Sequence, residues 1–166
     1  MGDALHLPEK DMDTLRFGSI LHDIGRIGIP ENILNKEGRL TTEEFSMIKQ
    51  HPNMGFRILN DLTFMRDSVK IVHEHHEWYN GDGYPNKKSA EKINLLARIV
   101  CIADAFDAMT TQRPYRKTTL TQEEAIAELR VKSGTQFDPH LVEIFVSALQ
   151  KIAQEDLNRI VIRLVC

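Results

Sequence analysis

The segment that decides the fold is LLARIVCIAD, residues 95–104. Its residues are apolar on almost every side of a helix, which is typical of a helix that crosses the centre of a domain. Cys101 falls inside this run, where a small buried thiol is the ordinary interpretation. Asp104 closes the run, and we therefore expect its carboxylate to lie deep in the protein.

Helical periodicity continues upstream of this segment. Apolar residues from Leu15 to Leu21 predict a helix whose C-terminal end delivers His22 and Asp23. A glycine-containing stretch, residues 25–28, then ends the pattern. The sequence therefore places an imidazole and a carboxylate side by side at the end of a helix.

Two capping boxes predict further helix starts. Thr41 with Glu44, and Thr121 with Glu124, each place a hydroxyl and a carboxylate three residues apart, as reciprocal capping of a helix N-terminus requires. We expect a helix to follow each of them.

After the first capping box, the apolar pattern predicts one long helix that carries His51 and is kinked at Pro52. A further helix is expected over residues 69–78, and it contains the run HEHHE at 73–77. The expected buried face of the long helix consists of Phe45, Ile48, Gly55, Ile58, Leu59 and Leu62.

The C-terminal part begins with Asp138 and Pro139, a pair typical of a helix N-cap with proline in the first turn. Residues 160–165, IVIRLV, are short and β-branched, which leaves open a strand, a helix end or an irregular tail. We expect an all-α fold: one helical bundle domain over residues 1–158 and a tail over 159–166. The apolar residues expected to bury the last helix are Leu141, Phe145, Leu149 and Ile152.

Composition limits the function classes. With 166 residues, 42% of them hydrophobic, the chain can bury one good core but hardly two. The 21 Lys and Arg against 24 Asp and Glu give a net charge of −3, so phosphate binding has to be local, and nucleic acid or an anionic membrane is not an expected partner. Two cysteines make no disulfide framework, which favours a reducing cytoplasm. No apolar stretch approaches the roughly 20 residues that a membrane helix requires.

Two pairs of metal-ligating residues carry the chemistry. Neighbours on a helix point about 100° apart, so His22 with Asp23, and His75 with His76, would fan toward two metal positions more easily than chelate one ion. Two ions roughly 3.5–4 Å apart stabilise both the attacking and the leaving oxygen in phosphoryl transfer. Hydrolysis of a phosphate ester is the reaction that such a centre predicts.

The other histidines have plainer interpretations. His6, His73 and His140 are expected to be surface or hydrogen-bonded residues, although His73 lies three residues before His76 and by spacing alone would be a candidate ligand. A His-Glu-x-x-His zinc motif would need its second histidine at position 77, where Glu77 stands. A metalloprotease is therefore excluded.

Taken together, these motifs resemble the HD-GYP domains, the subgroup of HD-superfamily phosphohydrolases that degrades the bacterial messenger cyclic di-GMP. The resemblance covers nearly the whole chain, and the order and spacing of the motifs agree. The residues that carry it are LHDIGRIGIP (21–30), His51, HHE (75–77), GDGYP (81–85), ADAFDAMT (103–110), RPYR (113–116) and GTQFDP (134–139).

The resemblance implies a metal centre, with Asp23 as the carboxylate that bridges the ions. It implies two divalent ions, or three in a longer protein that supplies a further ligand; iron or manganese is expected, and zinc, nickel or magnesium stays open. The implied metal ligands are His22, Asp23, His51, His75, His76 and Asp104.

The resemblance also implies a substrate site. The loop that contains Gly83, Tyr84 and Pro85 is expected beside the nucleotide, where glycines permit backbone turns that a β-branched residue would resist. Arg113 and Arg116 match positions that contact the substrate phosphates, where a guanidinium gives a bidentate grip.

Two departures from the family pattern stand out. Arg26 replaces the lysine of the usual His-Asp-x-Gly-Lys motif, a residue expected to assist at the scissile phosphate, so the charge survives while the donor geometry changes. Only about 20 residues precede His22, so we expect residues 1–158 to be an HD-GYP domain that lacks its first helix and the metal ligand on it. His6 is not expected to replace that ligand.

The function implied by the resemblance is hydrolysis of cyclic di-GMP to pGpG and then GMP, with Asp23 and Arg26 as the catalytic residues. One alternative is an HD phosphohydrolase that acts on another cyclic dinucleotide or a nucleotide. The other is a catalytically weak signalling or interaction domain. Diguanylate-cyclase-type proteins are implied as partners, and a homodimer stays open.

Overall fold

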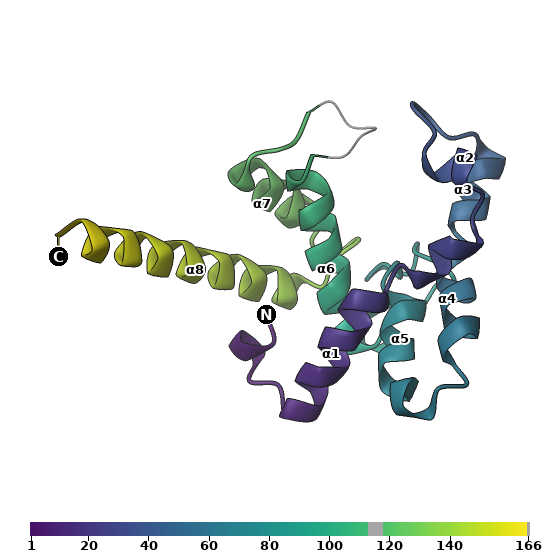
Figure 1. Cartoon of the computed structure of the whole chain (residues 1–166), viewed down its shortest axis with the longest axis horizontal. Coiled ribbons are helices and arrows are strands. Elements are labelled where there is room, and N and C mark those ends of the chain that lie inside the picture. Colours follow the sequence, from purple (N-terminus) through teal and green to yellow (C-terminus); the bar gives the residue numbers. More distant parts are fainter. Residues whose placement is uncertain (113–117, 166) are drawn as a thin grey trace.

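The computed structural model describes the backbone of residues 1–112 and 118–165, and side chains up to residue 154. These ranges fold into α-helices joined by short 3₁₀ helices, with no β-strand (Figure 1). The expected all-α fold is confirmed. The α-helices are α1 (Glu9–Leu21), α2 (Glu31–Leu34), α3 (Thr42–Ile48), α4 (His51–Leu59), α5 (Arg66–Glu74), α6 (Leu95–Thr110), α7 (Gln122–Val131) and α8 (Pro139–Val165); the 3₁₀ helices are η1 (Asp3–Leu5), η2 (Ile24–Gly28), η3 (Thr63–Met65) and η4 (Ala90–Lys92).

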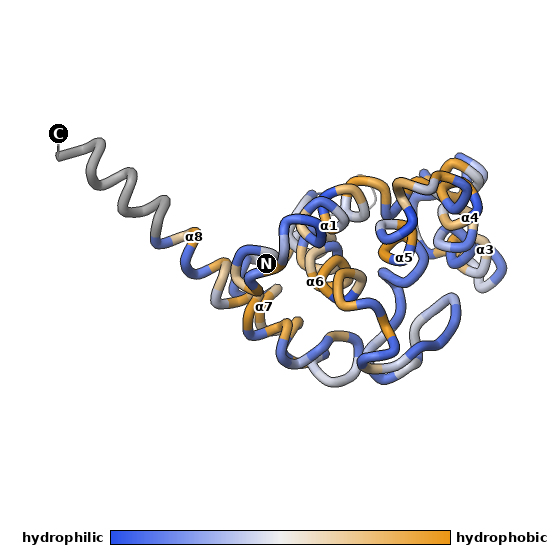
Figure 2. The backbone as a smooth tube through the Cα atoms, turned by 90° about the horizontal axis from the view of Figure 1, so that it is seen from below, coloured by the Kyte–Doolittle hydropathy of each residue, from blue (hydrophilic) through white to orange (hydrophobic). Residues whose placement is uncertain are grey.

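Helix α6 lies at the centre of the fold, as its sequence predicts. It contacts α1, α5, α7 and α8, and Ile99 and Ile102 on it are buried. Cys101 is buried too, and its burial raises the pKa of the thiol to about 12. The apolar stretches of the backbone gather along α6 and α5 (Figure 2). The core therefore packs around this one helix.

The prediction that the carboxylate of Asp104 lies deep in the protein is wrong. Its side chain is 21% exposed, because α6 turns this position toward the end of α1, where Oδ1 lies 3.8 Å from Nε2 of His22. Although the sequence of α6 is apolar almost throughout, the helix directs the carboxylate of Asp104 toward His22 at the end of α1.

The long helix expected after Thr41 consists of two helices. Thr41 caps α3 through the predicted capping box, but α3 ends at Ile48 and α4 begins at His51. Pro52 lies in the first turn of α4, where a missing N–H costs nothing, so it starts a helix rather than kinking one. The prediction of one buried face is also wrong in part, because Phe45, Ile58 and Leu62 are all exposed.

The second and third capping motifs occur as predicted. Thr121 forms a capping box with Glu124 at the start of α7. The carboxylate of Asp138 accepts hydrogen bonds from the backbone N–H groups of His140 and Leu141 at the start of α8. Both helices therefore begin where local side-chain chemistry places them.

Helix α8 extends well beyond the other helices (Figure 1). Its first turns bury Leu141 and Phe145 as expected, whereas Ile152 is 56% exposed, contrary to expectation. The segment left open at 160–165 belongs to this helix, so the strand and the irregular tail are both wrong. Within the described ranges, no helix combines the length and the hydrophobicity that a membrane crossing needs.

Candidate metal centre

Three helix ends and the side of α6 bring the predicted ligands together. His22 and Asp23 follow α1, His51 is the first residue of α4, and His75 and His76 follow α5. Helix α5 was expected to continue to Trp78, but it ends at Glu74, so the two histidines leave the helix and turn inward. Asp23, His51, His75 and His76 each offer a ligand atom, and these atoms all lie within 4.8 Å of one another.

Three histidines share one orientation. The Nδ1 atoms of His22, His51 and His75 lie 2.7, 2.7 and 2.9 Å from the backbone carbonyl three residues earlier in the chain. A carbonyl can only accept, so Nδ1 carries the proton and Nε2 keeps its lone pair free. This second hydrogen bond is the arrangement that fixes metal-ligating histidines in proteins.

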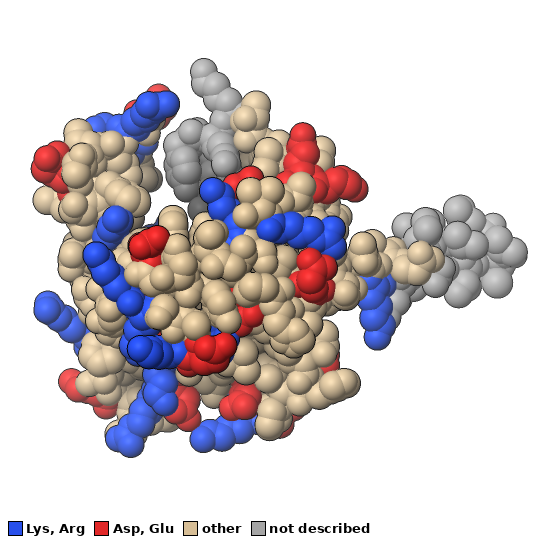
Figure 3. All heavy atoms as spheres, turned by 180° about the vertical axis from the view of Figure 1, so that it is seen from behind, with Lys and Arg blue, Asp and Glu red and all other residues tan. Residues whose placement is uncertain are grey.

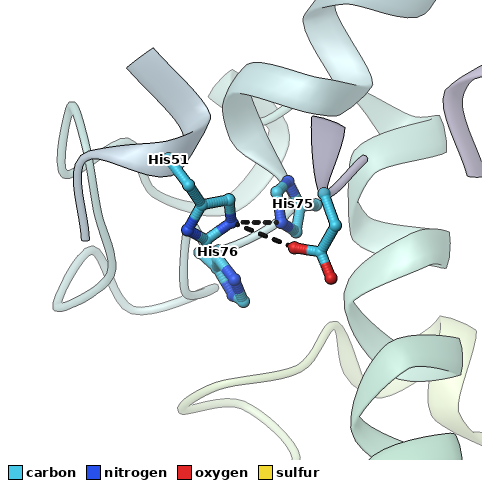
Figure 4. A group of neighbouring side chains, drawn as sticks. His51, His75 and His76 are labelled. Carbon is cyan, nitrogen blue, oxygen red and sulfur yellow. Dashed lines mark hydrogen bonds and ion pairs between the residues drawn. The ribbon is translucent and has the colours of Figure 1, made fainter. Parts of the chain in front are cut away.

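The free nitrogens converge. Nε2 of His51 lies 3.2 Å from Nε2 of His75, and the two imidazoles point toward one another in Figure 4. Since both nitrogens are acceptors, a hydrogen bond between them has no proton, and a cation is what would bring them together. Two nitrogens bound to one ion at about 2.1 Å, with a bond angle of about 100°, would lie about 3.2 Å apart. The spacing fits a shared metal ion.

The two carboxylate oxygens of Asp23 lie near two different histidines. Its Oδ1 lies 3.3 Å from Nε2 of His51, and its Oδ2 lies 3.3 Å from Nε2 of His22. Oδ1 of Asp23 and Nε2 of His22 are buried, and neither has a hydrogen-bond partner among the described residues. Buried polar atoms that lack a hydrogen bond are rare in native proteins, so a metal ion beside Asp23 is a suitable partner for them.

Burial sets the charge of this group. It lowers the pKa of His75 to about 3 and that of His76 to about 2, so both rings are neutral. Burial alone would raise the pKa of Asp23, but the contact with His22 when that ring is protonated and the charge of Arg26 outweigh it and lower the pKa below its ordinary value. Neutral imidazoles around an ionised carboxylate are the donor set that divalent transition metals take.

Arg26 lies against the centre. It belongs to η2, and its Nε lies 2.7 Å from Oδ1 of Asp23 as an ion pair without hydrogen-bond geometry. The preceding residue, Gly25, explains the close approach of η2 to α4, because a Cβ there would overlap the carbonyl of His51 and the N–H of Gly55. A glycine is thus required to bring Asp23 and Arg26 to His51.

The loop over residues 81–85 covers the centre on the side of His76. The ring of Tyr84 packs on the ring of His76, with centres 4.8 Å apart and planes 31° apart, and Tyr84 N–H donates to the carbonyl of His76 at 3.1 Å. A Cβ at Gly83 would overlap the backbone of Trp78 and His76, so this position also requires glycine. Pro85 follows Tyr84 and is partly buried.

Two buried carboxylates, Glu74 and Glu77, bind the segment that follows this loop, and no role was predicted for either of them from the sequence. Glu77 accepts from the backbone N–H groups of Asn86 at 2.6 Å and Lys88 at 2.9 Å. Glu74 accepts from Nζ of Lys88 at 2.6 Å and from the backbone N–H of Asn94 at 2.7 Å. The available signal was their place beside the histidines of the run 73–77, because acidic residues there bring charge close to the candidate centre.

The remaining candidates fall outside this group. His73 bonds Oδ1 of Asn53 through Nε2 at 2.9 Å and packs against Phe56, as expected of a histidine without a metal. His6 and His140 are also outside the ligand group found among the described residues. Arg113 and Arg116, expected at the substrate phosphates, lie outside the described residues.

Comparison with known proteins shows the family. The chain belongs to the HD domain family, whose model matches residues 1–141. It is 39% identical over 154 residues to a cyclic di-GMP phosphodiesterase of Thermotoga maritima, a match that covers 92% of this chain and 42% of that protein. It is 37% identical over 142 residues to the 3′3′-cGAMP-specific phosphodiesterase 2 of Vibrio cholerae, covering 84% of this chain and 27% of that protein.

A solved structure shows the same fold. An HDGYP protein from Bdellovibrio bacteriovorus matches with a TM-score of 0.73 at 22% identity, covering 90% of this chain and 47% of that one. The HD-GYP resemblance expected from the motifs is thereby confirmed. The chain spans less than half the length of these relatives.

Proposed function

We propose that this chain is a metal-dependent phosphodiesterase that hydrolyses a cyclic dinucleotide, with cyclic di-GMP as the substrate. The observation that carries the proposal is the position of Asp23, whose two oxygens face His51 on one side and His22 on the other. A carboxylate between two sets of nitrogen donors is what a two-metal hydrolase uses to hold its ions together.

Two divalent ions fit the donor atoms, and iron or manganese is the proposed identity. His51, His75 and Asp23 would hold one ion, and His22, Asp23 and Asp104 surround the other position, with His76 beside the first. When bound, such ions supply Lewis acidity and a hydroxide nucleophile at neutral pH. Nitrogen and carboxylate donors suit several divalent metals, so the choice among them falls to measurement.

The chain's own residues bind and orient the substrate. Arg26 lies next to Asp23 and would balance charge on the scissile phosphate, a guanidinium presenting donors in a planar fork. Burial raises the pKa of Tyr84, so its hydroxyl stays protonated and acts as a hydrogen-bond donor to the nucleotide. Cleavage of one phosphodiester gives linear pGpG, and cleavage of the second gives GMP.

A second substrate has a specific observation in its favour. The relatives of similar identity include both cyclic di-GMP phosphodiesterases and 3′3′-cGAMP-specific ones. The two molecules differ in one base, and metal ligands that act on a phosphate do not select a base. 3′3′-cGAMP is therefore the competing substrate. A cytoplasmic location, diguanylate-cyclase-type partners and a homodimer stay predictions.

The experiment that tests the proposal compares three proteins on two substrates. The protein is stripped of metal and reloaded with manganese or with iron under anaerobic conditions, and the products from cyclic di-GMP and 3′3′-cGAMP are separated by chromatography. Turnover that appears on reloading and is lost in Asp23→Asn supports the proposal, with His73→Ala as the control that keeps the metal ligands. Metal-loaded protein that binds either molecule without cleaving it would make the chain a sensing domain instead.

A further inference from the structure

A second cation lies close to the metal centre, at Lys49. Its Nζ lies 4.6 Å from the ring centre of Phe45 and 5.5 Å from the ring centre of Tyr84. The ring of Tyr84 in turn packs on His76. The four side chains His76, Tyr84, Lys49 and Phe45 thus follow one another from the metal centre outward, and the last is 46% exposed.

The backbone segment that carries Lys49 also positions the predicted ligand His51. Lys49 caps the C-terminus of α3, and its N–H donates to the carbonyl of Phe45 at 3.0 Å. The residue before it, Ile48, supplies the carbonyl that accepts from Nδ1 of His51 at 2.7 Å. The same short break between α3 and α4 therefore positions both the ligand and the ammonium group.

The charge on Lys49 is not balanced by an acid. Arg26 has Asp23 at 2.7 Å and Lys88 has Glu74 at 2.6 Å, but among the described residues no carboxylate forms an ion pair with Lys49. Aromatic rings within about 6 Å attract an ammonium group while leaving its donors free. Three free N–H donors on a compact charge are suited to a phosphate.

Lysines elsewhere on the surface provide a comparison for Lys49. Seen from behind, most of the visible Lys and Arg side chains lie on the half of the molecule away from the projecting end of α8 (Figure 3). Lys70 is an example of an ordinary exposed lysine, with Asp67 at 3.3 Å as its partner. It makes a matched control for Lys49.

We propose that Lys49 binds the phosphate of the cyclic dinucleotide that is not being cleaved. This inference rests on the proposed function. A cyclic dinucleotide has two phosphodiesters, so when one lies at the metal centre the other lies one nucleotide away on the same ring. The ring of Tyr84 lies between Lys49 and His76. The ammonium group, which has no ion-pair partner among the described residues, is therefore at about the separation expected for the second phosphate. Phe45 is a positioning residue for the ammonium group.

The test uses a substrate with two phosphates and one with a single phosphate. In the manganese-loaded protein, Lys49→Met should lower kcat/KM for cyclic di-GMP about tenfold more than for bis(p-nitrophenyl) phosphate, mainly through KM, because one charge-assisted hydrogen bond is lost. Lys49→Arg should recover most of the difference, and Lys70→Met should lack it. Equal losses on both substrates, or none on either, would overturn the inference.

A binding measurement tests the Lys49 subsite independently of the proposed catalytic activity. The dissociation constant of cyclic di-GMP is measured by calorimetry on metal-free protein, where no turnover occurs. An approximately tenfold weaker binding by Lys49→Met supports the subsite even if the wild-type chain cleaves nothing, a result that would overturn only the proposed function. Unchanged affinity in Lys49→Met, or absence of binding by the wild type, overturns the subsite, whereas the proposed function is tested by turnover of the metal-loaded protein.

Discussion

Nε2 of His51 and Nε2 of His75 lie 3.2 Å apart, and each ring uses its Nδ1 to donate to a backbone carbonyl. Neither nitrogen has a proton to offer the other. Two lone pairs are thus held face to face by backbone hydrogen bonds from two different helices. Folding has already oriented these two donors for a positive ion, so a metal ion should bind with little rearrangement of the protein.

Metal binding should therefore stabilise the fold. At an ion concentration 100-fold above the dissociation constant, the free energy of unfolding should rise by about 2.7 kcal/mol. His51→Ala removes a donor atom and should lose most of that gain, whereas His73→Ala, which removes a histidine bonded to Asn53, should keep it. Thermal unfolding with and without manganese measures both, and an equal manganese effect in all three proteins would refute the assignment of His51.

Glu77 should control the loop that carries Tyr84. Glu77→Gln replaces one of two acceptor oxygens with a donor, which would then face a backbone N–H, so we expect a loss of about 1–3 kcal/mol in stability. The amides of Asn86 and Lys88 should exchange with solvent faster. Glu91→Gln, at an exposed acid that accepts from the hydroxyl of Tyr79, is the control. Unchanged exchange at both amides would show that Glu77 does not hold the loop.

Gly25→Ala should separate η2 from α4. The new Cβ would overlap the backbone of His51 and Gly55, which cannot move as a side-chain end does, so metal affinity should fall together with stability. Gly38→Ala is a useful comparison, because its Cβ meets nothing within 4 Å while its φ of +97° still disfavours alanine. It should cost about 1–2 kcal/mol and leave metal affinity unchanged. Full metal affinity in Gly25→Ala would contradict the close-contact argument.

The ion pair between Arg98 and Asp138 should matter more than an exposed pair of the same type. Both side chains are largely buried, and Asp138 also caps α8, so Asp138→Ala leaves a buried guanidinium alone and should cost about 3–5 kcal/mol. Glu143→Ala breaks the exposed pair with Arg130 and should barely change the midpoint of urea unfolding. Similar midpoint shifts for the two variants would refute the role of burial.

The sequence predicts which side chains gather at the candidate centre better than it predicts the elements that carry them. His22, Asp23, His51, His75 and His76 are expected ligands by residue type, and the structure brings them close together, while their role as ligands stays a prediction. The end of α5 at Glu74 is not recognisable, because HEHHEW contains nothing that forbids a helix. The helix stops because Glu74 and Glu77 bond to backbone that lies 9–20 residues further along the chain. Such tertiary bonds have no local sequence signal.

The break between α3 and α4 shows the same limit. A proline inside an apolar pattern is compatible with a kink or with a new helix, and periodicity alone does not decide between them. The structure starts a new helix at His51 and leaves Lys49 at the junction. The ammonium group beside Tyr84 follows from that break, so it was invisible in the sequence.

Anomalous diffraction from crystals grown with manganese would show whether Asp23 joins two metal ions. We expect two anomalous peaks, one near His51 and His75 and the other near His22 and Asp104, with one oxygen of Asp23 directed at each. A single peak held by the histidines alone, or no peak within reach of Asp23, would contradict it.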